Sequence, residues 1–372
     1  MGSSADSSRY DRGTVIYIMK NQEEMNTINA NGKLIDLSTP QVMGILNVTP
    51  DSFYAGSRKQ TEMEIAARAD QIISEGGTMI DIGAFSTRPG AAQVSAGEEM
   101  ERMRHALQTV RGVQPDAVLS IDTFRPEIAR MAVEEYGAAI INDVSEGNIN
   151  GAFGGADATN PNGETEENDR QYPAIFRMVA KLGVPYILMS THGDMRDIMM
   201  HFAKEVQQLR DLGAKDIILD PGFGFGKTFD QNYTLLENME QLLEFDLPVL
   251  VGASRKSMIF KLFGTTPAEA LNGTTVINTI SLMKGASILR VHDVAGCAQT
   301  INAYWAVSEK DPRQGFVSLG SNVGDRVANL TRAVQLIDQI PLTCVANVSH
   351  AYETEPAYGI ATPVVNCVAE IR

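Results

Sequence analysis

Short apolar stretches rich in β-branched residues recur along the chain, and each is followed by a longer amphipathic segment. The strand candidates are nearly continuous in apolar character, which is typical of strands buried on both faces of a sheet. They lie at residues 41–48, 78–84, 117–122, 138–144, 184–190, 215–220, 247–253 and 287–293. Between them, segments such as 61–77 and 97–112 place apolar residues at helical spacing, and the first ends in two glycines that predict a helix stop.

Eight strand–helix repeats within residues 41–298 predict an α/β fold, and they favour a closed (β/α)8 TIM barrel over an open doubly wound sheet. In such a barrel the active site lies at the carboxyl ends of the strands and in the loops that follow them. Amide, carboxylate and cationic side chains gather at or near these ends. They are Asn47, Asp81, Asp122, Asn142, Asp143, Asp220, Lys256, Arg290 and His292.

Two segments interrupt the repeat. Residues 34–40 pair with 13–19 in a predicted hairpin that closes the bottom of the barrel. Residues 147–171 are rich in glycine, polar and acidic residues, and they follow the fourth strand, on the catalytic face. This run fits either a mobile insertion or a lid that closes over a substrate. The domain organisation we predict is a flexible tail at 1–13, a barrel at 14–307, a linker at 308–315 and a small domain at 316–372.

The charge of the chain narrows its partners. Its 372 residues carry a formal net charge of −15 with no Lys/Arg-rich run, which argues against nucleic acid and anionic membranes as main partners. Three cysteines in no metal-binding spacing fit a reducing cytoplasm better than a disulfide-built secreted protein. No apolar run reaches the roughly 18 residues that a membrane helix needs, and no signal peptide opens the chain, so we expect a cytoplasmic location.

The stretch DPGFGFGKT, residues 220–228, ends like a nucleotide-binding P-loop. The P-loop pattern requires a glycine five residues before the final Gly-Lys. That position holds Pro221, which has no N–H to offer a phosphate. The spacing therefore argues against a P-loop ATPase.

Cations and carboxylates at the strand ends suggest a site for a charged, flat ligand. Arg290 and His292 stand two apart on one strand, so they face the same side and suit a phosphate, although a structural ion pair is an alternative. Buried carboxylates and amides need hydrogen-bond partners, which a heterocycle or a barrel-core network would supply. Asn47 offers an oxygen that fits Mg²⁺, or it is a turn residue.

The motifs MGILNVTPDSF, DIGAFSTRPGA, SIDT, INDVS, DPGFGFGKT, GASRKS and LRVHDV occur in order over residues 41–298. As a set they resemble dihydropteroate synthase. The resemblance implies a transferase of folate biosynthesis that joins 6-hydroxymethyl-7,8-dihydropterin diphosphate to p-aminobenzoate, with Mg²⁺, in a homodimer. A pterin-dependent methyltransferase barrel is the alternative, but it has no use for the diphosphate site that Lys256, Arg290 and His292 suggest.

The resemblance also implies roles for individual residues. The pterin would contact Asp122, Asn142, Asp220 and Lys256, and the diphosphate would contact Asn47, Arg290 and His292, with Asn47 as the metal ligand. The catalytic set would be Asp122, Lys256, Arg290 and His292. The p-aminobenzoate pocket, where sulfonamides compete, would be formed by Phe53, Thr87, Arg88, Pro89, Phe225 and Ser257. His192 lies in a loop that departs from the family pattern. It either replaces the histidine of that loop or lies on the surface, and the surface position is the one expected.

Residues 316–372 resemble the first half of 6-hydroxymethyl-dihydropterin pyrophosphokinase. LGSNVGD opens a strand-to-helix unit, YETEP matches a loop beside the pterin, and Asn366 matches a pterin-contacting asparagine. An α+β, ferredoxin-like fragment is therefore expected. Because the family's paired magnesium aspartates lie in its later half, we expect no pyrophosphokinase activity from this part of the chain.

Overall fold

The computed structural model of the chain describes residues 27–48, 58–85, 94–148, 172–307, 315–338, 345–355 and 362–371. The chain divides into two compact units, Met1–Thr300 and Ile301–Arg372. The division falls within helix α9 (Val294–Val307), a few residues before the end that we predicted for the barrel domain.

The first unit is built on eight parallel strands, each at a predicted position. They are β3 (Gln41–Asn47), β4 (Met79–Gly83), β5 (Val118–Asp122), β6 (Ile140–Asp143), β7 (Tyr186–Met189), β8 (Ile217–Asp220), β9 (Leu250–Val251) and β10 (Ile288–Val291). Their order in the sheet is β8-β7-β6-β5-β4-β3-β10-β9, and a bridge between Leu219 and Val249 joins the two ends. The predicted TIM barrel is confirmed.

The joint between β8 and β9 is narrower than the other joints of the barrel. Strand β9 has only two residues, and β8 meets this part of the chain through the single Leu219–Val249 bridge, with Leu219 N–H donating to Pro248 O at 2.9 Å. By contrast, β3 and β4 are in register at five positions. Among the described residues, backbone pairing is therefore extensive between β3 and β4 and minimal where β8 meets β9.

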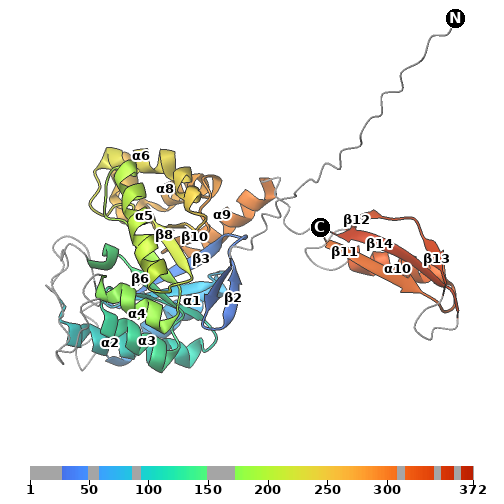
Figure 1. Ribbon diagram of the computed structural model, residues 1–372, viewed down its shortest axis with the longest axis horizontal. Helices are drawn as coiled ribbons and strands as arrows, with labels where there is room; N and C mark the ends of the chain where they lie inside the picture. Colours follow the sequence, from blue (N-terminus) through green and yellow to red (C-terminus); the bar gives the residue numbers. More distant parts are fainter. Residues whose placement is uncertain are drawn as a thin grey trace, which may run out of the picture. The chain divides into compact units, whose positions relative to one another are not determined.

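Helices surround the strands on the outside of the barrel (Figure 1). Ser95 caps the helix α2 (Ala96–Val113) by accepting the Glu98 N–H, and Thr228 caps the helix α6 (Phe229–Asn238) in a capping box with Gln231. Among the described residues, no helix combines the length and apolar character needed to cross a membrane. The helices are α1 (Arg58–Ser74), α2 (Ala96–Val113), α3 (Pro126–Tyr136), α4 (Ala174–Leu182), α5 (Met195–Asp211), α6 (Phe229–Asn238), α7 (Ser257–Leu262), α8 (Leu271–Met283) and α9.

A hairpin of β1 (Thr27–Ala30) and β2 (Lys33–Asp36) closes the amino-terminal end of the barrel. Buried Ile28, Ala30 and Leu37 belong to one core cluster with residues near the starts of the barrel strands. The predicted closure is thus correct, but the partner strand is 27–30 and the predicted 13–19 lies outside the described residues. Asn31 and Gly32 both have positive φ, so an Asn-Gly turn that the sequence displays sets this pairing.

The second unit is a small antiparallel sheet with one helix, as the expected α+β fragment requires. Its strands are β11 (Gly315–Ser321), β12 (Val345–Val348), β13 (Tyr352–Thr354) and β14 (Val364–Ile371), and β14 pairs with each of the others. Helix α10 (Arg326–Asp338) contributes Leu330 to a core with Val365 and Cys367.

Candidate active site

Charged side chains from three strands meet inside the carboxyl-terminal mouth of the barrel. Arg290, from β10, donates from Nε to Asp81 Oδ2 at 2.6 Å and from Nη2 to Asp122 Oδ2 at 2.9 Å. Asp81 lies in β4, and Asp122 ends β5. Arg290 is thus engaged within the protein through Nε and Nη2, and these two bonds do not use Nη1.

Asp81 is the residue at this site to which sequence analysis assigned no role. Its carboxylate is fully buried and also accepts hydrogen bonds from Ser120 Oγ at 2.6 Å and from Asn142 Nδ2 at 3.1 Å. The available signal was an aspartate in the middle of the apolar strand candidate 78–84, because a buried carboxylate requires charged or hydrogen-bonding partners.

Asn142 presents a buried acceptor to this mouth. Its side chain in β6 is 1% exposed. While Nδ2 donates to Asp81, Oδ1 has no hydrogen-bond partner among the described residues. A buried carbonyl oxygen without a partner costs about 1–3 kcal/mol. The arrangement therefore suits a ligand that donates a hydrogen bond to Oδ1.

The glycine-rich turn after β8 positions Asp220. Gly222 N–H donates to Asp220 Oδ1 at 2.8 Å, and Gly222 has a φ of 72°. A Cβ at this residue would lie 2.0 Å from Ser190 O, so only glycine fits. Lys227, the lysine of the Gly-Lys-Thr sequence, donates to Ser190 O at 3.1 Å and Phe225 O at 3.3 Å. The turn therefore fixes the Asp220 carboxylate, and its lysine binds backbone carbonyl groups.

Lys256 stands beside Asp220 at the start of α7. Its Nζ donates to Phe223 O and lies 4.3 Å from the centre of the Phe225 ring. Burial lowers the pKa of Lys256 to about 7, although Asp220 opposes this change. The preceding Arg255 instead forms a bidentate ion pair with Asp293, at 2.6 and 2.7 Å. Of the two cations in the SRKS segment, only Lys256 therefore enters the site.

Burial dominates the electrostatics of the carboxylates at the mouth. It raises the pKa of Asp122 to about 7, with Arg290 acting in the opposite direction and Asp81 adding to the rise. Burial also raises the pKa of Asp220, and the nearby Lys256 opposes it. Asp122 therefore titrates near neutral pH, close to Lys256, which does the same, and Asp220 is shifted in the same direction as Asp122.

His292 is neutral at physiological pH. Burial lowers its pKa to about 4, and the positive charges of Arg290 and Arg255 contribute. Its Nδ1 lies 3.1 Å from Ser254 Oγ, which itself accepts the His292 backbone N–H at 3.2 Å. The Ser254 hydroxyl therefore holds both the backbone and the ring of His292, and in the tautomer with its hydrogen on Nε2 this hydroxyl donates to Nδ1. Arg68, in α1, donates to His292 O at 2.6 Å and helps to fix this segment.

Asn47 ends β3, and its exposed side chain lies next to the carboxylates. A Cβ placed on Gly83 would lie 3.2 Å from Asn47 Oδ1 and 3.5 Å from Asp122 Oδ2. The two oxygens thus border a space kept open by a glycine. Oxygen donors that leave most of the coordination sphere to phosphates and water fit Mg²⁺.

Part of the predicted site lies outside the described residues. Phe53, Thr87, Arg88 and Pro89 are in this group, as is most of the 147–171 insertion. Phe225 and Ser257, assigned to the same p-aminobenzoate pocket, are described. Phe225 packs against the Lys256 ammonium, and Ser257 is the first residue of α7.

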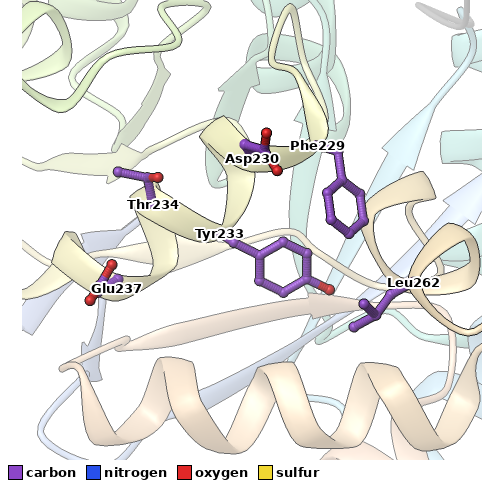
Figure 2. A pocket seen from close by; sticks show the side chains of 6 residues that line it. All are labelled: Phe229, Asp230, Tyr233, Thr234, Glu237 and Leu262. Carbon is purple, nitrogen blue, oxygen red and sulfur yellow. The ribbon is translucent and has the colours of Figure 1, made fainter.

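A groove on the outer wall of the barrel is separate from this site. It has a volume of about 370 Å³ and lies between α6 and α7. Figure 2 shows Phe229, Tyr233 and Leu262 pointing toward one another there. Tyr233 Oη donates to Met258 O at 3.0 Å, which ties the two helices together. None of the residues that we assigned to catalysis lines it.

The fold and the mouth of the barrel match known proteins. Residues 43–292 match the family described as "Pterin binding enzyme", and the chain belongs to this family. Within it the chain belongs with the dihydropteroate synthases, which are transferases. Residues 316–372 match the family described as "7,8-dihydro-6-hydroxymethylpterin-pyrophosphokinase".

Three similar proteins illustrate this relationship. Dihydropteroate synthase of Escherichia coli K12 is 37% identical over 280 residues, which is 71% of this chain and 90% of that protein. The Xanthomonas albilineans dihydropteroate synthase structure with 4-aminobenzoic acid has a TM-score of 0.65 at 33% identity and covers 76% of this chain and 98% of that one. The Yersinia pestis enzyme in a sulfonamide drug complex has a TM-score of 0.62 at 34% identity, with coverages of 75% and 98%.

Proposed function

We propose that the barrel condenses 6-hydroxymethyl-7,8-dihydropterin diphosphate with p-aminobenzoate, giving dihydropteroate and diphosphate. The pterin ring occupies the mouth, between the carboxylates of Asp122 and Asp220 and the amide of Asn142, with Lys256 at its edge. Family membership supports this proposal, as does the placement of acceptors for the ring N–H groups. The observation that carries it is the buried, unpartnered Asn142 Oδ1.

The diphosphate binds beside this ring pocket. Arg290 Nη1 and the neutral His292 Nε2–H donate to its oxygens. The positions of the two residues support this, since Arg290 lies on β10 and His292 directly follows it. A bound Mg²⁺, held by Asn47 and phosphate oxygens, would supply further positive charge to the leaving group.

The reaction needs no enzyme nucleophile. The bond between the pterin methylene carbon and the diphosphate oxygen breaks, and its electron pair leaves with the diphosphate. The positive charge on the methylene is delocalised into the ring, where Asp122 stabilises it, while Arg290 and His292 stabilise the departing anion. The amine of p-aminobenzoate attacks the methylene carbon and loses a proton to solvent.

The p-aminobenzoate pocket adjoins Phe225 and Ser257, with Phe53, Thr87, Arg88 and Pro89 as its further residues. Support comes from the similar Xanthomonas and Yersinia proteins, whose structures hold 4-aminobenzoic acid and a sulfonamide drug. Sulfonamides should therefore compete with p-aminobenzoate and raise its KM without changing kcat.

Diphosphate release with and without p-aminobenzoate tests the proposal. Release that depends on p-aminobenzoate supports the synthase, whereas its absence would favour the alternative, a pterin-dependent methyltransferase barrel. A more specific test is the variant Asn142→Ala, which removes one proposed contact to the ring and should raise the pterin KM about tenfold or more.

Asn278→Ala is a matched control for Asn142→Ala. Asn278 is also buried and its Oδ1 is also without a hydrogen-bond partner among the described residues, but it lies in α8. Its replacement should lower stability while leaving the pterin KM unchanged. Equal KM values in both variants would show that Asn142 does not contact the ring.

We also propose that the barrel dimerises through its outer helices. Exposed Val276 and Met283 on α8 support an apolar interface there. Light scattering of Met283→Glu beside wild type tests this, since a charge in the interface should produce monomers.

A further inference from the structure

We propose that Glu146, His192 and His201 form a binding site for a divalent transition metal such as Zn²⁺, separate from the position of Mg²⁺ beside Asn47. Within the described ranges, these three side chains are the one group of at least three His, Cys, Asp or Glu residues placed to hold a metal. One ligand atom from each lies within 4.8 Å of the others.

The three ligands come from segments that the fold brings together. Glu146 follows β6 in the short 3-10 helix Glu146–Asn148, His192 lies between β7 and α5, and His201 is on α5. His192 Nε2 is 3.4 Å from Glu146 Oε1, and the two imidazole rings stack with their centres 3.7 Å apart. His192 is therefore half-buried in a cluster, which differs from the surface position we expected.

Glu146 is held firmly in place. Its side chain is buried and accepts hydrogen bonds from the Thr191 hydroxyl, from Thr191 N–H at 3.3 Å and from Ser190 Oγ at 3.3 Å. These bonds fix the carboxylate beside His192. A preformed ligand of this kind reduces the loss of conformational freedom on metal binding.

Glu205 supplies an independent observation that points to a bound cation. It lies one turn after His201 on α5, with Oε1 3.8 Å from His201 Nδ1. Its side chain is 1% exposed, and Oε2 has no hydrogen-bond partner among the described residues. The nearby Glu146 carboxylate disfavours a second negative charge on Glu205. A cation between the two carboxylates would supply the compensating charge.

The donor set selects the class of metal. Two imidazoles and a carboxylate suit Zn²⁺ and similar ions, whereas Mg²⁺ prefers oxygen ligands alone. Tetrahedral Zn²⁺, with bonds of about 2.0–2.1 Å, separates its ligand atoms by about 3.4 Å. The Glu146–His192 distance already has this value, and rotation of His201 would close the remaining gap of at most about 1.4 Å. Glu205 or water completes the fourth position.

Metal binding to the full chain without substrates tests the site directly. We expect one Zn²⁺ per chain by calorimetry and a visible Co²⁺ absorption band typical of a four-coordinate site, neither removed by excess Mg²⁺. His192→Gln and His201→Gln should each weaken Zn²⁺ binding at least tenfold. Zn²⁺ should raise the Tm of the wild type but not of these variants.

The matched control is His105→Gln. His105 lies 3.9 Å from Glu62, so it forms a histidine–carboxylate pair outside any group of three among the described side chains. This variant should bind Zn²⁺ like the wild type. Wild-type affinity in His192→Gln and His201→Gln, or an equal loss in His105→Gln, would overturn the proposal. Circular dichroism of each metal-free variant checks that folding is intact. Glu146→Gln tests the third ligand in the same way.

Discussion

Asp81 Oδ2 lies 2.6 Å from Arg290 Nε, and this ion pair crosses β3 because Asp81 is on β4 and Arg290 is on β10. Asp81 is fully buried, while Arg290 is 14% exposed. The pair therefore holds the guanidinium in the mouth with one edge toward Asp122 at 2.9 Å. Asp81 thus has a structural role, because it fixes the position of Arg290.

Removing Asp81 should destabilise the barrel strongly. Asp81→Ala leaves the buried Arg290 with one carboxylate partner fewer and should lower the free energy of unfolding by about 3–5 kcal/mol. Urea unfolding measures this change. Glu135→Ala breaks the exposed Arg104–Glu135 pair and should change the free energy of unfolding far less. Similar losses in the two variants would contradict the structural role of Asp81.

The pH dependence of turnover should reflect the titration of both Asp122 and Lys256. In the proposed mechanism Asp122 stabilises positive charge only when it is ionised, so activity should rise as the pH increases through about 7. Lys256 loses its charge as the pH increases through about 7, so activity should fall on the alkaline side. Initial rates of diphosphate release across pH give both limbs of this narrow bell-shaped profile.

Variants assign the two limbs. Asp122→Asn should lower kcat and remove the acid limb, and Lys256→Gln should remove the alkaline limb. The phosphate groups of the substrate also titrate, so an acid limb that persists unchanged in Asp122→Asn belongs to the substrate and contradicts the assignment.

His292 should act as a neutral hydrogen-bond donor. Its pKa of about 4 leaves the ring uncharged between about pH 5 and 8. His292→Gln retains an N–H donor and should raise the pterin diphosphate KM only a few-fold, while His292→Ala should raise it about tenfold. If His292 acts as a cation, the two variants will be equally impaired and the wild-type KM will rise as the pH passes about 6.5.

Gly222 should tolerate no side chain. Gly222→Ala combines a φ of 72° with a Cβ only 2.0 Å from Ser190 O, so it should cost more than about 3 kcal/mol and displace Asp220. Gly213→Ala is the control, because Gly213 also has positive φ but open space around the new Cβ. It should cost only about 1 kcal/mol. Thermal unfolding and kcat of both variants separate the steric clash from backbone strain.

The sequence predicted the strands because their apolar runs are buried on both faces, a property local to each run. It also placed Asp122, Asn142 and Arg290 at one face, because parallel strands bring their carboxyl ends together. Their detailed pairing was not predictable. That Arg290 contacts both Asp81 and Asp122 depends on the curvature of the barrel and on side-chain rotamers, which no linear spacing encodes.

Two other features show where sequence reasoning failed. The Asn-Gly at 31–32 was a local hairpin signal that we overlooked in favour of a more distant apolar run. The Glu146, His192 and His201 cluster joins residues far apart in the chain, and no motif connects them. Only the packing of α5 against the loops after β6 and β7 brings them together.

The single bridge between Leu219 and Val249 has a consequence for the breathing motions of the barrel. Asp220 follows directly on one side of this joint, and Lys256 belongs to the segment on the other. Spontaneous opening between β8 and β9 would therefore pull apart the two groups that we propose hold one edge of the pterin. A ring that contacts both would connect the two sides of this sparsely paired joint, so amide hydrogen exchange there should slow when the pterin diphosphate binds.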